Sequence, residues 1–166
     1  MRVLSWQFSL MSENEEAEFL PDCPREQLPI TRTPEFKVKR PLPSAIDFSN
    51  TRAKELLEAQ WHDRMDAGFS GTMVDFGEII PEEAVFSDGR TGAEMHNAYA
   101  VDYTRAYREL FLRHRGEDHV LFSRTAAAGT QKYACQFGGD QLSSMRGLTF
   151  AISGGISAAM SGLPFW

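Results

Sequence analysis

Two short segments carry aspartates at the points where predicted strands end. Asp75 lies in VDFGE (residues 74–78), and Asp140 lies in FGGDQ (residues 137–141). Two carboxylates presented from neighbouring strand ends are the groups that cleave a glycosidic bond, one as nucleophile or base and the other as proton donor. The pair therefore predicts a catalytic centre that acts on a sugar linkage.

The chemistry makes different demands on the two aspartates. A nucleophilic Asp75 must be rigid and ionised, and a nearby cation such as Arg124, which directly follows a predicted strand, favours the ionised form. A proton donor at Asp140 must be partly desolvated, and Phe137 offers apolar surroundings. Taken singly, each has a simpler interpretation: the aspartates as turn residues, and Arg124 as half of a structural salt bridge.

The composition excludes several classes of protein. The chain has 166 residues, enough for one domain with a sizeable core, and its net charge of −6 argues against a nucleic-acid partner. Two cysteines build neither a disulfide framework nor a zinc site, so we expect a reducing, cytoplasmic location. His96 has no second histidine one helical turn away, and neither a metal nor a cofactor is expected. No apolar run approaches the roughly 18 residues that span a membrane.

Prolines divide the chain into two regions. Six of the eight prolines fall within residues 1–43, which predicts an irregular connection because proline lacks a backbone donor and stops helices. From residue 44 onward, apolar periodicity and caps such as Asn50 and Gly116 predict a regular alternation of elements. The predicted helices cover 51–67, 92–114 and 143–161, and the predicted strands cover 44–48, 71–76, 119–123, 133–137 and the residues from 163.

Strands joined through helices predict a parallel sheet, either closed as a barrel or open and doubly wound. No GxGxxG or GxxxxGKS/T motif follows a predicted strand, which argues against a nucleotide-binding fold. Polar residues recur at the strand ends instead, at Asp75, Arg124 and Asp140. Reactive groups on this edge are typical of the (β/α)8 barrel, so the predicted fold is α/β, a partial (β/α)8 TIM barrel.

Together these segments resemble family 31 of the glycoside hydrolases, which are retaining α-glycosidases with a (β/α)8 catalytic domain. The matching segments occur in the family's order and at its spacing. They are IDFSN (46–50), VDFGE (74–78), MHNAY (95–99), LFSR (121–124), GTQKY (129–133), FGGDQ (137–141), GGIS (154–157), MSG (160–162) and FW (165–166).

The resemblance implies a role for each candidate residue. Asp75 would be the catalytic nucleophile and Asp140 the general acid/base, while Arg124 would hydrogen-bond sugar hydroxyls. Phe137 would line the same site, where many members carry tryptophan. Met73, two residues before the nucleophile, is tryptophan or lysine in other members, and methionine is similar to bacterial enzymes that include sulfoquinovosidases and some α-glucosidases. The implied substrate is an α-linked oligosaccharide or another α-glycoside, cleaved without a metal or cofactor.

The resemblance covers residues 44–166, about half of the roughly 250 residues of a barrel, so we expect a fragment from the centre of the catalytic domain. Two alternatives stay open. A partial barrel with unpaired sheet edges could be an inactive fragment or a sugar-binding pseudoenzyme. An enzyme in which a sugar hydroxyl replaces water would be an α-transglycosylase.

Overall fold

Four parallel strands form one sheet, and their order in space follows their order in the chain. The computed structural model describes residues 3–8, 46–78, 80, 82 and 84–163. The strands are β1 (Val3–Phe8), β2 (Phe69–Asp75), β3 (Val120–Ser123) and β4 (Cys135–Gln136), arranged β1-β2-β3-β4. In the register Met73 of β2 lies between Trp6 of β1 and Phe122 of β3.

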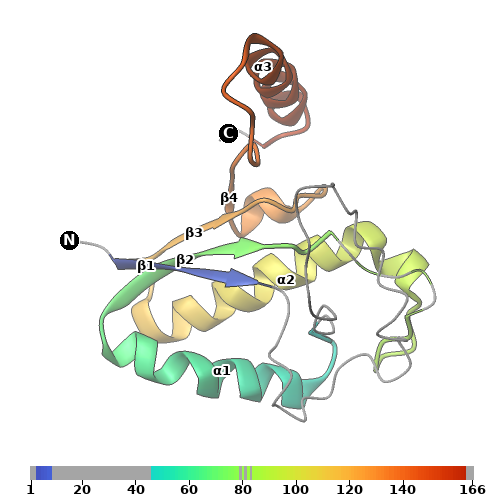
Figure 1. The fold of residues 1–166 in the computed structure, drawn as a ribbon. Helices are drawn as coiled ribbons and strands as arrows, with labels where there is room; N and C mark the ends of the chain where they lie inside the picture. The colour runs from blue at the N-terminus through green and yellow to red at the C-terminus, as the bar shows by residue number, and fades with distance from the viewer. Residues whose placement is uncertain (1–2, 9–45, 79, 81, 83, 164–166) are drawn as a thin grey trace, which may run out of the picture.

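The two long helices cover one face of this sheet. Figure 1 shows α1 (Thr51–Asp66) and α2 (Gly92–Arg115) on the same side of the strands, where they pack on β2 and on each other. A doubly wound sheet would reverse its strand order and carry helices on both faces. Sequential strand order with one helical layer is the winding of a (β/α)8 barrel, so the predicted fold class is confirmed as a partial barrel.

Local signals set the ends of both helices. The Asn50 side chain accepts a hydrogen bond from the Arg52 N–H at 2.9 Å, which caps α1. A reciprocal capping box starts α2: the Thr91 N–H donates to the Glu94 carboxylate at 2.8 Å, and the Glu94 N–H donates to the Thr91 hydroxyl at 3.3 Å. Gly116, with a φ of +57°, ends α2. Both helices begin where the sequence predicts.

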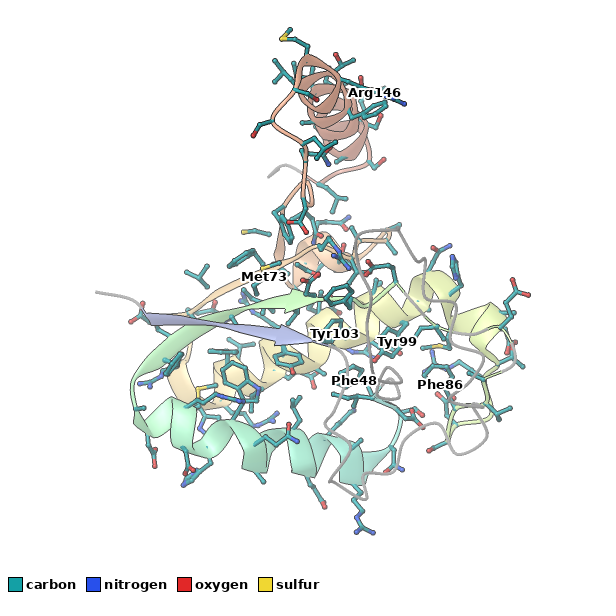
Figure 2. The ribbon with its side chains drawn as sticks, viewed as in Figure 1. Phe48, Met73, Phe86, Tyr99, Tyr103 and Arg146 are labelled. Atoms are coloured by element: carbon teal, nitrogen blue, oxygen red, sulfur yellow. The ribbon has the colours of Figure 1, made fainter. Side chains whose placement is uncertain are left out.

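The hydrophobic core lies between the sheet and these two helices. Tyr99, Tyr103 and Tyr107 of α2 are fully buried, and their spacing of four places them on one face of the helix. Trp61 of α1 packs edge-on against Tyr107, with 5.9 Å between ring centroids. Figure 2 shows Tyr99 and Tyr103 beneath the sheet, close to Phe48. This aromatic packing fixes α2 under the ends of the central strands.

A buried carboxylate joins the segment before α1 to the loop before α2. Asp47 has no exposed surface, and its oxygens accept four hydrogen bonds. Ser49 donates through its N–H at 2.9 Å and its hydroxyl at 2.6 Å, and Ser87 donates through the same groups at 2.8 Å and 2.6 Å. A buried carboxylate needs this number of donors, so Asp47 holds together two segments that are forty residues apart.

The last helix has a different environment. α3 (Met145–Met160) begins after Ser144, whose hydroxyl accepts the Gly147 N–H at 3.1 Å. Figure 1 shows this helix standing away from the sheet. Its apolar stripe at steps of four, formed by Leu148, Ile152 and Ile156, is more than half exposed. The predicted helix is therefore present, but its apolar face is not covered by the described part of the chain.

The structure corrects several predicted elements. The irregular connection predicted for residues 1–43 is wrong over Val3–Phe8, which forms β1; residues 9–43 lie outside the described residues. The strand predicted over 44–48 is not formed in its described part, where Ile46 makes a single bridge and a turn follows. Residues 133–137 keep only the two-residue β4, because Tyr133 ends η1 (Thr130–Lys132). A strand from 163 onward cannot begin at Leu163, which is not in a strand, and residues 164–166 lie outside the described residues.

Candidate active site

The carboxyl ends of β2 and β3 bring a buried carboxylate against a guanidinium. Asp75 is the last residue of β2, and Arg124 follows the last residue of β3. The Arg124 Nε lies 3.1 Å from the Asp75 Oδ1, and the Phe76 N–H donates to the same oxygen at 3.0 Å. The side chain of Asp75 is only 5% exposed. The contact predicted between Arg124 and Asp75 is therefore present.

The chain turns sharply directly after Asp75. Phe76 has a φ of +58°, which is uncommon for a residue with a bulky side chain and marks local backbone strain. The turn places the Phe76 ring against Arg124, whose Cζ lies 4.2 Å from the ring centroid. It also returns Glu78 to Arg124, where Glu78 Oε1 and Arg124 Nη2 form a second ion pair. The guanidinium is thus held by two carboxylates and one aromatic face.

Tyr103 supports the strand end from below. Its hydroxyl donates to the backbone oxygen of Asp75 at 3.1 Å, and this hydrogen bond is buried. Burial raises the pKa of the Tyr103 phenol well above its usual value of 10.0, and the charge of Asp75 adds to the rise. The phenol therefore stays protonated and remains a donor, which fixes the backbone that carries Asp75.

Gly77 occupies a place with no room for a side chain. A Cβ atom at this position would lie 2.6 Å from both the Thr125 Cγ2 and the Tyr103 Cδ1. We expect Gly77→Ala to destabilise the protein by about 1–3 kcal/mol, because the added methyl overpacks the strand end. Denaturant unfolding of the purified variant measures this loss as a lower transition midpoint. An unchanged midpoint would show that the turn after Asp75 can shift without cost.

Asp140 follows β4 in a glycine-rich segment that passes beside Arg124. Gly139 has a φ of +77°, and a Cβ atom built on it would lie 3.9 Å from the Arg124 Cδ. The Gln141 side chain closes the turn by donating to the backbone oxygen of Gly138 at 2.8 Å. The side chain of Asp140 is exposed, so the apolar surroundings expected from Phe137 do not enclose it. Arg124 therefore lies beside both of the segments that carry the aspartates.

Met73 and Phe137 lie near the same edge. Met73 is two residues before Asp75, so the two side chains leave the strand on the same face. Figure 2 shows Met73 on the side of the sheet away from α1. Phe122, its register neighbour on β3, packs edge-on against Phe137 with 6.0 Å between ring centroids. These three half-buried apolar side chains form a surface on the sheet face that the helices leave open.

The structure brings Asp75 into contact with Arg124 and places Met73 and Phe137 on either side of Phe122. Asp140 forms no hydrogen bond or ion pair with any of these described residues, and only its neighbour Gly139 lies beside Arg124. Glu78 and Tyr103 also contact this cluster, and the sequence alone assigned neither a role. Glu78 was visible as a second carboxylate close to Asp75, and Tyr103 as part of the apolar stripe of α2. Within the described residues, no group of three or more histidine, cysteine, aspartate or glutamate side chains is placed to hold a metal ion. No helix in that part of the chain is long and apolar enough to cross a membrane.

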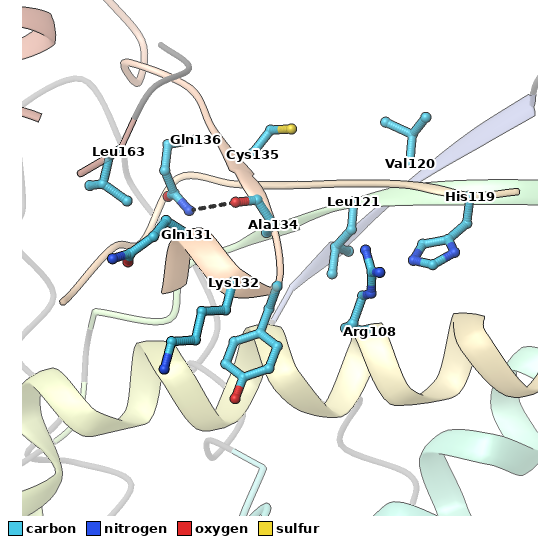
Figure 3. Close-up of a pocket in the computed structure, with 11 residues that line it drawn as sticks. Arg108, His119, Val120, Leu121, Gln131, Lys132, Ala134, Cys135, Gln136 and Leu163 are labelled. Atoms are coloured by element: carbon cyan, nitrogen blue, oxygen red, sulfur yellow. Dashed lines mark hydrogen bonds between the residues drawn. The ribbon is translucent and has the colours of Figure 1, made fainter. Parts of the chain in front are cut away.

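The pocket in Figure 3 is a separate feature. It lies between α2, η1 and the strands β3 and β4, and its lining includes Arg108, His119 and Lys132. None of the five predicted site residues lines it. The candidate site is therefore the strand-end cluster around Arg124, not this pocket.

Comparison with known proteins agrees with the barrel fold. The sequence profile described as "Glycosyl hydrolases family 31 TIM-barrel domain" matches residues 11–166, and so begins earlier than the boundary at 44 suggested by the sequence. An isomaltosyltransferase of Sporosarcina globispora is 36% identical over 123 residues, which cover 73% of this chain and 11% of that protein. An alpha-xylosidase of Emericella nidulans is 32% identical over 125 residues, which cover 74% of this chain and 16% of that protein.

A solved structure shows the same arrangement of elements. The cycloalternan-degrading enzyme from Trueperella pyogenes, in complex with a covalent intermediate, superposes with a TM-score of 0.76 at 25% identity. The match covers 100% of this chain and 24% of that chain, so the chain spans at most about a quarter of the length of these three relatives. The chain belongs to glycoside hydrolase family 31, and it forms part of the TIM-barrel domain of that family.

Proposed function

We propose that this chain carries the catalytic centre of a retaining α-glycosidase, with Asp75 as the nucleophile and Asp140 as the general acid/base. The ion pair between Asp75 and Arg124 carries the proposal, because it holds a buried carboxylate in a fixed orientation at a strand end. Asp140 is exposed and makes no ion pair among the described residues, so these residues do not supply the partial desolvation that a proton donor needs. In this proposal the fixed carboxylate of Asp75 is the nucleophile, and the accessible carboxyl of Asp140 gives and takes the proton.

The reaction proceeds in two displacements at the anomeric carbon. In the first, a carboxylate oxygen of Asp75 forms a bond to the anomeric carbon while Asp140 gives its proton to the departing glycosidic oxygen. In the second, Asp140 takes a proton from water, the water oxygen bonds to the anomeric carbon, and the ester to Asp75 breaks. Two inversions restore the α configuration. The covalent intermediate named for the Trueperella pyogenes enzyme supports this route.

Arg124, Phe137 and Met73 would shape the sugar site. A guanidinium has five N–H donors, and two are used by the ion pairs to Asp75 and Glu78, so Arg124 can also donate to sugar hydroxyls. Phe137 and Met73 add apolar surface on the same side of the sheet, against which a sugar ring can stack. The substrate we propose is an α-linked oligosaccharide or another α-glycoside, which the names of the relatives support.

Transfer to a sugar is the second candidate reaction. The isomaltosyltransferase name of one relative favours it, because transfer and hydrolysis share the glycosyl-enzyme and differ only in the acceptor. In transfer, Asp140 would take the proton of a sugar hydroxyl in place of water.

The proposal is tested on the full-length gene product with aryl α-glucoside, α-xyloside and α-sulfoquinovoside. We expect one of these to be cleaved, and proton NMR of the first product to show the α anomer. A first product in the β configuration would contradict the two-displacement mechanism. Products longer than the substrate would identify transfer. A folded protein that cleaves none of the three would favour a non-catalytic barrel.

A further inference from the structure

Glu78 is not one of the residues proposed to act on the sugar, but it contacts one of them, Arg124. The turn at Phe76 brings Glu78 to the neighbouring strand end, where its Oε1 pairs with the Arg124 Nη2. The other side of the same guanidinium, Nε, pairs with the Asp75 Oδ1 at 3.1 Å. Arg124 therefore links a carboxylate that is 5% exposed to one that is 45% exposed.

Four contacts hold Arg124, and Glu78 makes one of them. Its backbone N–H donates to the Val74 oxygen at 3.3 Å, which anchors the start of the residue. The ring of Phe76 covers one face of the guanidinium, at 4.2 Å from Cζ. Rotation of the guanidinium in its own plane is limited by the carboxylates of Asp75 and Glu78, which pair with Nε and Nη2. Loss of Glu78 would leave the Nη2 end of the guanidinium without its carboxylate.

We infer that Glu78 is a positioning residue, which acts through Arg124 and does not contact the reacting atoms. By fixing the Nη2 end of the guanidinium, Glu78 sets the direction of the remaining N–H donors and keeps Nε on Asp75. The inference rests on the proposed function, because it gives Glu78 a part in the roles proposed for Asp75 and Arg124. An exposed ion pair with no such part would contribute little and would leave catalysis unchanged.

The test compares Glu78→Ala and Glu78→Gln with Arg124→Ala and the double variant in the full-length gene product. We expect Glu78→Ala to lower kcat about 100-fold with KM little changed, because a displaced guanidinium costs transition-state stabilisation. Glu78→Gln keeps the length and one acceptor oxygen, so it should recover part of kcat. The double variant should be no slower than Arg124→Ala alone, because residues that act as one unit are not additive.

Three outcomes would overturn the inference. The first is an unchanged kcat in Glu78→Ala, and the second is an effect on KM alone. The third is a double variant in which the two losses of kcat add, which would mean that Glu78 acts on the substrate directly. If Glu78→Ala fails to fold, the isosteric Glu78→Gln and its double variant with Arg124→Ala carry the same comparison.

Two controls separate this inference from its premise. Glu117→Ala removes a comparable exposed ion pair, between Glu117 Oε2 and Arg108 Nη2 at 2.7 Å, and should leave kcat unchanged. Asp75→Asn in the same assay tests the proposed function itself. Activity that survives Asp75→Asn would reject the proposed nucleophile. Activity lost in Asp75→Asn but kept in Glu78→Ala would reject only the positioning role.

Discussion

Replacement of Asp75 by alanine is expected to lower kcat/KM on an aryl α-glycoside by on the order of 10⁴- to 10⁶-fold, the loss typical of removing a catalytic nucleophile. The side chain ends β2, is buried and pairs with Arg124, so its truncation removes the proposed attacking oxygen from the site. Initial rates over a range of substrate concentrations give the ratio. Asp66→Ala removes an exposed aspartate at the end of α1 and should leave kcat/KM unchanged.

Added azide distinguishes a missing nucleophile from a misfolded site. In Asp75→Ala, azide can enter the space left by the carboxylate and displace the leaving group in a single step, which gives the β-glycosyl azide. Recovery of rate with that product would assign the nucleophile to Asp75. Full activity without azide would contradict the assignment.

Asp140→Ala is expected to slow the enzyme in proportion to the need of the leaving group for a proton. On a substrate with an alkoxide leaving group, kcat/KM should fall by about 10²- to 10⁴-fold, the usual contribution of general acid catalysis. On a glycosyl fluoride, whose leaving group needs little protonation, formation of the glycosyl-enzyme should be nearly as fast as in the unaltered protein. Rates across a series of leaving groups measure the difference.

The azide product again provides the decisive observation for Asp140. With Asp75 intact, azide attacks the glycosyl-enzyme from the face opposite the ester, so the product is the α-glycosyl azide. The two variants should therefore give azides of opposite configuration. A loss in Asp140→Ala that is equal for all leaving groups would show that Asp140 is not the proton donor.

The helices could be predicted from the sequence because their signals are local. The side chain of Asn50, the Thr91 and Glu94 pair and the glycine at 116 act within four residues of the helix ends they define. The strand β1 could not be predicted in this way. Val3–Phe8 is short, and its partner Phe69–Asp75 comes about sixty residues later, so the pairing depends on a contact that no local pattern reveals. The acidic and proline-rich residues that follow Phe8 also favoured an irregular interpretation.

Only part of the candidate site could be predicted from the sequence, for the same reason. Aspartates and an arginine at consecutive strand ends predicted that Asp75 and Arg124 would meet, because parallel strands share an edge. Glu78 was not assigned because its approach to Arg124 depends on the positive φ of Phe76, a conformation that a phenylalanine does not signal. The exposure of Asp140 also could not be predicted, because it depends on which segments cover the loop after β4.

The buried tyrosines of α2 make the free energy of unfolding depend on pH at alkaline values. Burial raises the pKa of Tyr99 and of Tyr103 well above 10.0, and it raises the pKa of Tyr107 as well. Below pH 10 these phenols are protonated whether the chain is folded or not, so their contribution to stability is complete. As the pH rises further, only the unfolded chain releases their protons, and the free energy of unfolding falls. Because the Tyr103 proton is also the one donated to the backbone of Asp75, its loss on alkaline unfolding also removes the hydrogen bond that supports the end of β2.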